Sequence, residues 1–261
     1  MKLRMYQVDA FTEKLFGGNP AAVVPLTTWL SDELLQNIAM ENNLAETAFY
    51  VKKENIFHIR WFTPIVEVDL CGHATLATAH VLFNHENHTG KEILFDSRSG
   101  ELKVSRNEGL LTLDFPEDIF HEVELSDELC SGFNFRPVKA FKGKTDYMLV
   151  FENETQIRNI RPDYSAISKM GGRGVIATAK GDTVDFVSRF FAPQSGINED
   201  PVTGSAHTTL TPYWAEFIDK TELTATQLSP RQGQLVCKLS GDRILISGKA
   251  RTFLKGEIEI D

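Results

Sequence analysis

One segment occurs twice in this 261-residue chain, about half a sequence apart. The first copy is residues 60–64 (RWFTP) followed by residues 69–74 (DLCGHA), and the second is residues 189–193 (RFFAP) followed by residues 200–207 (DPVTGSAH). Each copy runs from an aromatic strand through a proline turn to an acidic residue, and then to small residues that open a helix. The length and the duplication together predict two similar halves.

The two predicted helix starts have the chemistry of an anion site. Glycine at Gly72 and Gly204 lets a ligand approach the main chain closely. The first N–H groups of a helix lack partners and favour negative charge. If folding brings both starts together, they clamp a carboxylate or its enolate. The pattern therefore predicts a small-molecule enzyme whose anionic substrate contacts Gly72 and Gly204.

Composition and charge narrow the class of partner. Apolar residues make up 42% and charged residues 24% of the chain, as in a folded globular protein. The formal charge is 27 − 36 = −9 and no basic cluster is visible, which argues against nucleic acid and anionic membrane surfaces. The N-terminus lacks a signal-peptide core, no stretch reaches membrane-spanning length, and three scattered cysteines predict no disulfide framework. The expected location is the cytoplasm.

Hydrophobic periodicity predicts an α+β architecture, with several mostly antiparallel strands around one buried helix in each half. Residues 74–83 are apolar nearly all round, which is typical of a helix enclosed by sheet. A helix that opens at Gly204 and Ser205 is its counterpart. The predicted halves are residues 1–116 and 117–249. The pattern leaves open whether the last strand, at about 250–261, returns to the first half.

Two side chains are candidates for proton transfer. Glu46 begins a strand among small and apolar residues, which disfavour its charged form and raise its pKa toward the range of an acid/base catalyst. The plainer alternative is a solvated glutamate at a strand edge. His73 lies at the positive end of a helix, which favours a neutral imidazole that passes a proton or binds a substrate oxygen. Its alternative is a capping or packed imidazole.

The second copy supplies two further candidates. Asp200 is placed to orient His73 or to bind a substrate hydroxyl, and Ser205 adds a donor beside the N–H of Gly204. An acid–proline turn and a helix cap explain either residue alone. They do not explain why both copies pair an acid with a glycine helix start.

A two-thiol mechanism and a metal site are both disfavoured. Cys71 at a helix start suits a thiol base, yet the second copy has Thr203 where a cofactor-free racemase needs a second thiol. Cys71, His73 and His80 share one segment without the carboxylate or paired-cysteine support of a metal site. We therefore expect no metal.

The sequence resembles the PhzF-like (phenazine biosynthesis) family. The matching motifs are residues 9–12 (DAFT), 16–23 (FGGNPAAV), 46–49 (ETAF), 60–64 (RWFTP), 71–75 (CGHAT) and 199–206 (EDPVTGSA). The resemblance implies a diaminopimelate epimerase-like fold of two pseudo-symmetric halves, with the active site in the cleft between them. It also implies a homodimer, no cofactor, and isomerisation of a small carboxylic acid by a proton shift.

The resemblance also implies roles for single residues. The glutamate that moves the proton in this family corresponds to Glu46, and its supporting residues correspond to His73, Asp200 and Ser205. Asn19, in the second motif, is expected to bind substrate. Many members carry serine where this chain has Ala45, and a lost hydrogen bond is worth ~0.5–1.5 kcal/mol. This difference affects the identity of the substrate rather than the reaction.

Two other functions stay open on the sequence. A serine hydrolase would use Ser205, His73 and Asp200, although the chain lacks a G-x-S-x-G elbow. A non-catalytic binding protein on the same fold needs none of these residues. The leading hypothesis is a cofactor-independent isomerase of a small carboxylic acid that moves one proton with Glu46.

Overall fold

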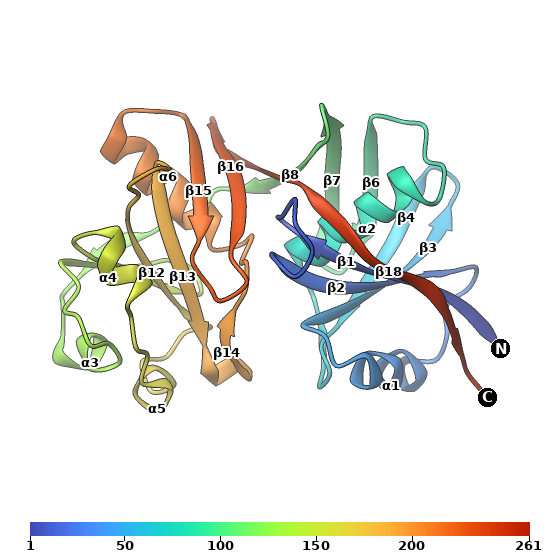
Figure 1. The fold of residues 1–261 in the computed structure, drawn as a ribbon, viewed down its shortest axis with the longest axis horizontal. Helices are drawn as coiled ribbons and strands as arrows, with labels where there is room; N and C mark the ends of the chain where they lie inside the picture. Colours follow the sequence, from blue (N-terminus) through green and yellow to red (C-terminus); the bar gives the residue numbers. More distant parts are fainter. The chain divides into compact units, whose positions relative to one another are not determined.

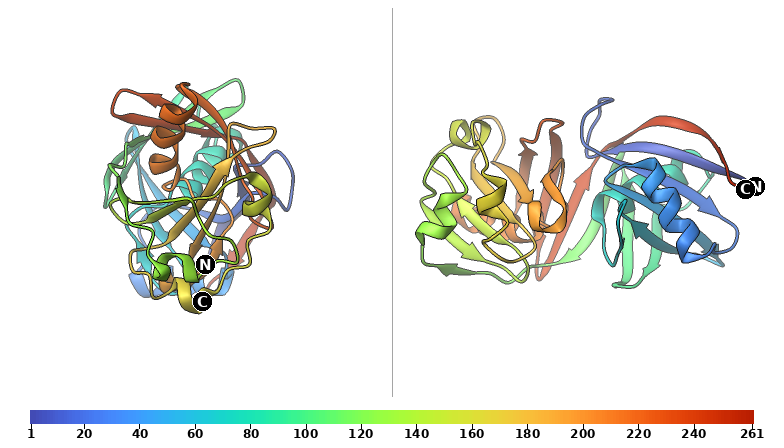
Figure 2. Two further views of the ribbon diagram at one scale, coloured as in Figure 1. Left: turned by 90° about the vertical axis from the view of Figure 1, so that its left-hand side faces the viewer. Right: turned by 90° about the horizontal axis from the view of Figure 1, so that it is seen from below.

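The computed structural model describes residues 1–261, which form two compact units (Figure 1). Unit 1 comprises Met1–Asp114 and Ser247–Asp261, and unit 2 comprises Phe115–Ile246. Strand β18 (Ala250–Glu259) pairs antiparallel with β1 (Lys2–Ala10), so the end of the chain belongs to unit 1. The two termini lie side by side there (Figure 2), where the N–H of Ile260 donates to the carbonyl of Met1.

The strands of unit 1 follow one another in a simple order. β1 pairs antiparallel with β2 (Asn19–Leu26), β2 pairs parallel with β3 (Glu46–Lys53), and β3 pairs antiparallel with β4 (Ile56–Phe62). β4 pairs antiparallel with the short β5 (Glu67–Val68) and parallel with β6 (Glu92–Ser97). β6 continues antiparallel into β7 (Gly100–Asn107) and then β8 (Leu110–Pro116).

Unit 2 repeats this order. Its strands are β9 (His121–Val123), β10 (Lys139–Lys142), β11 (Tyr147–Val150), β12 (Val175–Lys180), β13 (Phe186–Ala192), β14 (Ile197–Asp200), β15 (Glu222–Gln227), β16 (Gly233–Ser240) and β17 (Arg243–Gly248). The parallel pairs are β11 with β12 and β13 with β15, at the same places as β2 with β3 and β4 with β6. The prediction of two pseudo-symmetric, mostly antiparallel halves is confirmed.

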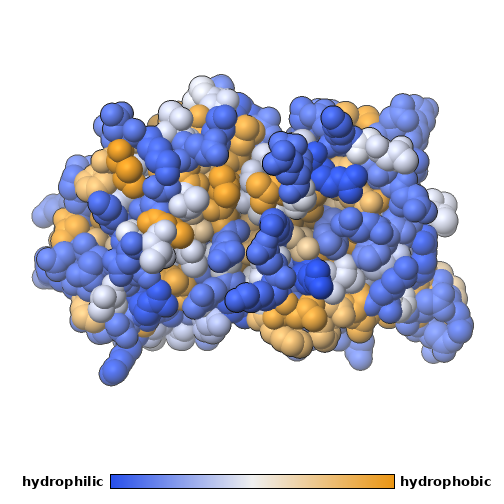
Figure 3. Space-filling model, turned by 45° about the horizontal axis from the view of Figure 1, so that its top comes forward, coloured by the Kyte–Doolittle hydropathy of each residue, from blue (hydrophilic) through white to orange (hydrophobic).

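Each unit contains one long buried helix. In unit 1 this is α2 (Gly72–Asn84), which packs on β1, β2, β3 and β18 and buries ten of its thirteen residues. In unit 2 it is α6 (His207–Ile218). The remaining helices are α1 (Asp32–Asn42), α3 (Asp127–Ser131), α4 (Glu154–Arg158), α5 (Tyr164–Ile167) and the 3-10 turn η1 (Pro193–Ser195). None is long and apolar enough to cross a membrane. On the face in Figure 3, hydrophilic residues are interspersed with apolar ones.

The same ion pair occurs in both units and explains the repeated arginine of the duplicated segment. In unit 1, Nε and Nη2 of Arg60 each lie 2.7 Å from an oxygen of Glu67. In unit 2, Nε and Nη2 of Arg189 lie 2.7 and 2.8 Å from the oxygens of Glu199. Two parallel charge-assisted hydrogen bonds fix both distance and orientation. Each pair therefore ties the aromatic strand to the acidic segment that precedes the buried helix.

Candidate active site

Glu46 is the first residue of β3, opposite Ala21 of the parallel strand β2. Its Oε2 lies 3.0 Å from Nε2 of His73, the second residue of α2, and the two side chains are only 12% and 7% exposed. Both atoms are buried, and neither has another hydrogen-bond partner in the chain, so the contact is a close ion pair. The carboxylate predicted for proton transfer is therefore buried beside an imidazole.

The other ring nitrogen of His73 has its own neighbours. Nδ1 lies 3.2 Å from Nδ2 of Asn19, the first residue of β2, and 3.5 Å from Sγ of Cys71. In a neutral ring, the amide of Asn19 donates to Nδ1 and the ring proton sits on Nε2, on the side of Glu46. In a protonated ring, Nδ1 is itself a donor and is met by the amide oxygen of Asn19, which a half-turn of the amide brings to the same place. Three of the residues expected at the site thus meet within unit 1. The sequence did not predict the contact of Cys71 with the ring.

Charge coupling decides how this group is protonated. Burial favours the neutral imidazole, but the interactions of the ring with Cys71 and Glu46 outweigh it, so the pKa of His73 lies well above its ordinary value. Burial, followed by the Glu46 carboxylate, raises the pKa of the Cys71 thiol. Cys71 is therefore neutral near pH 7, and Glu46 is the charge that acts on the ring. The expectation that the helix start keeps His73 neutral is wrong, because a full charge at 3.0 Å exceeds a partial helix charge.

Glu46, Cys71 and His73 also resemble a metal-binding set, since one ligand atom of each lies within 4.8 Å of the others. Cys71 and Glu46, however, lie against different nitrogens of the ring. An ion is bound by only one of those nitrogens. As they lie, the three side chains fit a proton-transfer group better than a metal centre.

The N-terminus of α2 leaves donors unused. The side chain of Cys71 does not cap the helix, and the first hydrogen bond runs from the N–H of Thr75 to the carbonyl of Cys71 at 3.1 Å. The N–H groups of Gly72 and His73 therefore have no acceptor within the chain, as is usual in the first turn of a helix. They are available to a negatively charged oxygen, as the sequence predicted for Gly72.

In unit 2, Asp200 is the last residue of β14, and three hydrogen bonds fix the loop that follows it. Its Oδ2 accepts a hydrogen bond of 2.5 Å from Oγ1 of Thr203. Gln227 of β15 accepts the N–H of Thr203 and donates to the carbonyl of Asp200, each at 2.8 Å. Gln227 is 1% exposed, so this clamp is an interior one. The sequence missed Gln227 because it did not predict β15.

The helix of the second copy begins later than predicted. α6 starts at His207, whereas Gly204 and Ser205 lie in a turn whose hydrogen bonds join residues three apart, such as His207 N–H to Gly204 carbonyl at 3.0 Å. Gly204 is buried and Ser205 is half-buried. The carbonyl of Ser205 accepts from both the N–H and the hydroxyl of Thr208. The N–H groups of Gly204 and Ser205 have no acceptor in the chain, so they remain possible ligand donors.

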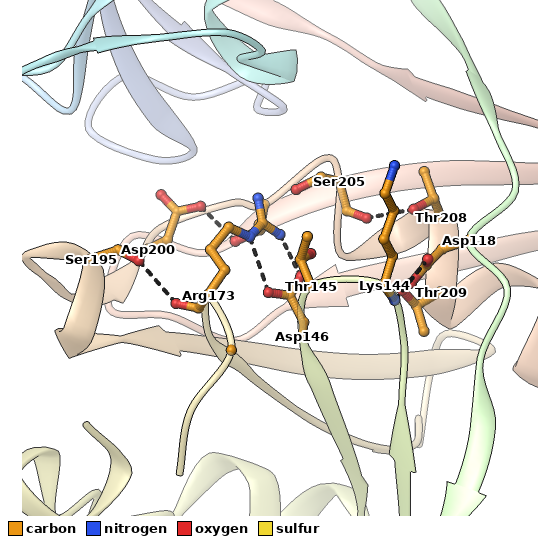
Figure 4. A network of polar contacts seen from close by, with 12 residues as sticks. Asp118, Lys144, Thr145, Asp146, Arg173, Ser195, Asp200, Ser205, Thr208 and Thr209 are labelled. Carbon is orange, nitrogen blue, oxygen red and sulfur yellow. Dashed lines mark hydrogen bonds and ion pairs between the residues drawn. The ribbon is translucent and has the colours of Figure 1, made fainter. Parts of the chain in front are cut away.

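Arg173 is a neighbour of Asp200 that the sequence did not indicate as a site residue. Its Nε and Nη2 bind Asp146 at 3.0 and 2.5 Å, and its carbonyl accepts the hydroxyl of Ser195. Figure 4 shows the guanidinium between Asp146 and the side on which Asp200 and Ser205 lie. The charges of Arg173 and Asp200 interact. Asp200 and Ser205 therefore share one polar cluster of unit 2.

The two units differ at the position of Glu46. Thr47 pairs with Phe62, and in unit 2 Val175 pairs with Phe191, the counterpart of Phe62 in the duplicated segment. The residue before each is Glu46 in unit 1 and Gly174 in unit 2. A Cβ on Gly174 would lie 2.4 Å from a ring carbon of Phe190 and 2.9 Å from the carbonyl oxygen of Phe191. The second unit has no room for an acid/base side chain at this position.

His207, the first residue of α6, predicts a pH dependence of stability. It is fully buried, Nδ1 donates to the carbonyl of Thr203 at 2.8 Å, and burial lowers its pKa to about 4. Between pH 6.5 and about 4 the unfolded chain binds a proton that the folded protein excludes. Stability is therefore complete above pH 6.5 and falls as the pH falls, by about 2–3 kcal/mol from His207 at pH 4.5.

Urea unfolding at pH 7.0 and 4.5 measures this effect. The difference in unfolding free energy between the two pH values is expected to shrink in His207→Gln relative to the unmodified chain. An unchanged difference would show that His207 does not titrate as its burial requires.

Comparison with known structures defines the fold. A hydroxyproline epimerase from Agrobacterium vitis gives a TM-score of 0.63 at 10% identity, covering 98% of this chain and 92% of that one. At this identity the likeness shows the fold alone. Together with the strand order above, it supports the predicted diaminopimelate epimerase-like fold.

The sequence and closer structures then define the family. Residues 8–256 match the phenazine biosynthesis-like protein family, PhzC-PhzF. An uncharacterised isomerase of Pseudomonas aeruginosa is 51% identical over 261 residues, covering all of both chains. The crystal structure of a PhzF family protein from Enterococcus faecalis gives a TM-score of 0.98 at 47% identity, also over all of both chains. The chain belongs to the phenazine biosynthesis-like family and is an isomerase by this kinship.

Proposed function

We propose that this chain isomerises a small carboxylic acid by moving one proton with Glu46. The observation that carries the proposal is the buried pair of Glu46 and His73, with Oε2 and Nε2 3.0 Å apart. The position equivalent to Glu46 in unit 2 is Gly174, which has no room for a second base. The counterpart of Cys71 is Thr203, whose hydroxyl donates to Asp200. These differences support a reaction with one acid/base rather than a pair.

In the proposed reaction, the Glu46 carboxylate removes a proton from a carbon of the bound acid. The electron pair left by that C–H bond is delocalised into the substrate as an enolate-like anion. Free N–H groups at Gly72 and His73 stabilise its negative oxygen, a role worth a few kcal/mol per donor when the donors are preorganised. Glu46, now protonated, returns the proton to a different carbon, and the double bond shifts accordingly. No net charge or electron is gained.

His73 has a supporting role in this scheme. Its ring N–H faces the Glu46 carboxylate, so it stabilises the charged base before the reaction and loses this contact energy when Glu46 becomes protonated. The same interaction between the ring and the Glu46 carboxylate contributes to the raised pKa of His73, so the two groups titrate as a coupled pair. Asn19 holds the ring from the other side, at 3.2 Å. We propose that Asn19 also lies near enough to bind substrate.

We extend the proposal to three residues of unit 2. Asp200 would bind a hydroxyl or amino group of the substrate, and Gly204 and Ser205 would donate to an oxygen. The support is their free donors, the clamp on Asp200 and the family resemblance. The duplicated segment carries an acid and a glycine turn in both units, and this repetition supports a ligand-binding role for the second copy as well.

A screen in heavy water tests the proposed reaction. Small carboxylic acids are incubated with the enzyme in D2O and analysed by mass spectrometry for a gain of one mass unit, because a returned proton is drawn partly from solvent. At least one acid is expected to gain deuterium in an enzyme-dependent manner. Substrates that gain none, together with hydrolysis of an ester or amide, would contradict the isomerase proposal.

The serine hydrolase alternative is disfavoured by His73. Nδ1 of His73 is near Asn19 and Cys71 and Nε2 faces Glu46, so both ring nitrogens are engaged within unit 1. A hydrolase of this kind needs one nitrogen to take the proton of Ser205. We expect a fluorophosphonate probe to leave Ser205 unlabelled. Labelling of Ser205 would restore this alternative.

We also propose that the protein is a cytoplasmic homodimer. Among the exposed apolar side chains of unit 1, four lie on two short segments of the chain, and two of these, Phe16 and Phe253, are in edge-to-face contact with ring centroids 5.8 Å apart. The other two are Leu15 and Leu254. An exposed apolar group of this kind is typical of a protein interface. Light scattering is expected to give twice the chain mass of 29.3 kDa.

A further inference from the structure

Unit 1 contains a cavity of about 710 Å³ whose lining includes neither Glu46 nor His73. The cavity lies among the C-terminal part of α2, the hairpin between β7 and β8, and the beginning of β18. Its lining includes His80, Asn84, Lys91, Arg106, Lys249 and Arg251. Cavities of a few hundred cubic ångströms are the size of small-molecule sites. Nothing in the proposed reaction uses these residues.

The charge of this cavity is opposite to that of the chain. Four cations and two carboxylates, those of Glu13 and Glu108, line it, whereas the whole chain carries a formal charge of −9. Glu13 is already paired with Lys249. No carboxylate lies within ion-pair distance of the other three cations, Lys91, Arg106 and Arg251. Their charges are therefore available to a ligand.

Arg106 is held in place without an acidic partner. Its guanidinium carbon lies 4.3 Å from the ring centroid of Phe83, which is itself buried. The N–H of Arg106 in β7 donates to the carbonyl of Lys91, the residue before β6, at 2.8 Å, so the two residues are neighbours. A guanidinium stacked on an aromatic face loses little further freedom when its N–H edge binds an oxyanion.

One wall of the cavity is formed by His80 and Asn84, and the ring nitrogens of His80 already have hydrogen-bond partners. Nδ2 of Asn84 donates to Nδ1 of His80 at 3.1 Å, which places the proton of His80 on Nε2, 2.9 Å from Oγ1 of Thr252. The hydroxyl of Thr252 then donates to Nε2 of His85 at 2.8 Å. Burial, and the charges of His85 and Arg251, lower the pKa of His80 to about 4. Both ring nitrogens of His80 are therefore occupied by neighbours within the chain.

We propose that this cavity binds a small molecule that carries a multiply charged oxyanion, such as a phosphate group. Three cations without ion-pair partners, one of them stacked on an aromatic ring, line one open cavity of an otherwise acidic protein. Arginine and lysine bind phosphate through directed, charge-assisted hydrogen bonds. The same chemistry is offered by a polycarboxylate, and the test distinguishes the two sources. This inference does not depend on the proposed isomerase reaction.

Isothermal titration calorimetry with sodium pyrophosphate tests the proposal, with citrate as the polycarboxylate arm and sodium chloride at equal ionic strength as the blank. Saturable binding of pyrophosphate is expected at one site per chain. Arg106→Gln and Arg251→Gln are each expected to weaken it by about tenfold. Arg161→Gln is the matched control, since Arg161 is exposed, in unit 2 and without an ion pair, and its affinity is expected to be unchanged.

Each outcome decides the proposal. Stronger binding of citrate than of pyrophosphate would assign the site to polycarboxylates, and the reverse to phosphates. No saturable binding of either, or equal affinity in all variants, would overturn it. Arg251 is exposed, so Arg251→Gln keeps the test valid if loss of the Arg106 stacking destabilises the fold. Glu46→Gln is expected to bind pyrophosphate normally, which separates this site from the proposed reaction.

Discussion

Replacement of Glu46 by Gln is expected to reduce turnover and solvent deuterium exchange by at least about 10²–10⁴-fold, the usual contribution of a general acid/base. The amide has nearly the same shape as the carboxylate but cannot accept the proton that the reaction removes. The loss of the carboxylate also removes the negative charge that helps to raise the pKa of His73. Exchange measured by mass spectrometry on an acid identified in the D2O screen gives the rate.

The variant is expected to keep its fold and its affinity for the acid, because the N–H donors at Gly72 and His73 are main-chain groups. Glu41→Gln is the matched control, since Glu41 is an exposed glutamate of α1, and it should leave the exchange rate unchanged. An exchange rate for Glu46→Gln close to that of the control would refute the role of Glu46. Weakened binding with an unchanged rate constant would instead make Glu46 a binding residue.

Replacement of Arg189 by Met is expected to destabilise unit 2 by about 3–5 kcal/mol, the typical cost of breaking a buried ion pair from one side. Both side chains of the Arg189–Glu199 pair are 10% exposed, and Nη1 of Arg189 also donates to the carbonyls of Ile157 and Ile160. The variant leaves the carboxylate of Glu199 buried without its partner. Urea unfolding, followed by circular dichroism, measures the loss.

The equivalent change in unit 1, Arg60→Met, is expected to cost less. Nη2 of Arg98 lies 2.7 Å from Glu67, so that carboxylate keeps one cation. The double variant Arg189→Met with Glu199→Met should recover most of the stability, because it buries no unpaired charge. Equal losses for Arg60→Met and Arg189→Met, or no recovery in the double variant, would contradict this account.

The sequence predicted the two halves and the buried helix because both depend on local patterns of residues. The duplicated segment predicted two halves, and the apolar run at residues 74–83 predicted the enclosed helix α2. The sequence did not predict β15, because its alternation of apolar and polar residues depends only on Leu223 and Ala225 among threonines, which is a weak signal. Gln227 of β15, which binds the Asp200 loop, was missed for the same reason.

The site was only partly predictable, because a motif names residues but not the atoms they meet. Glu46 and His73 were both predicted, yet the distance between them, and hence the raised pKa of His73, depends on how β3 packs against α2. The contact of Cys71 with the ring and the crowding around Gly174 depend on tertiary packing in the same way. A wrong charge state for His73 followed from considering the helix end without its neighbour.

The pairing of β18 with β1 has a consequence for biosynthesis. Unit 2 is continuous in the chain, so it has been synthesised in full while unit 1 still lacks its closing strand. Domains usually fold as they emerge, the earlier one first. Here the unit that is synthesised later is complete first. Unit 1, which contains Glu46, lacks the strand that pairs with β1 until the last residues have been translated.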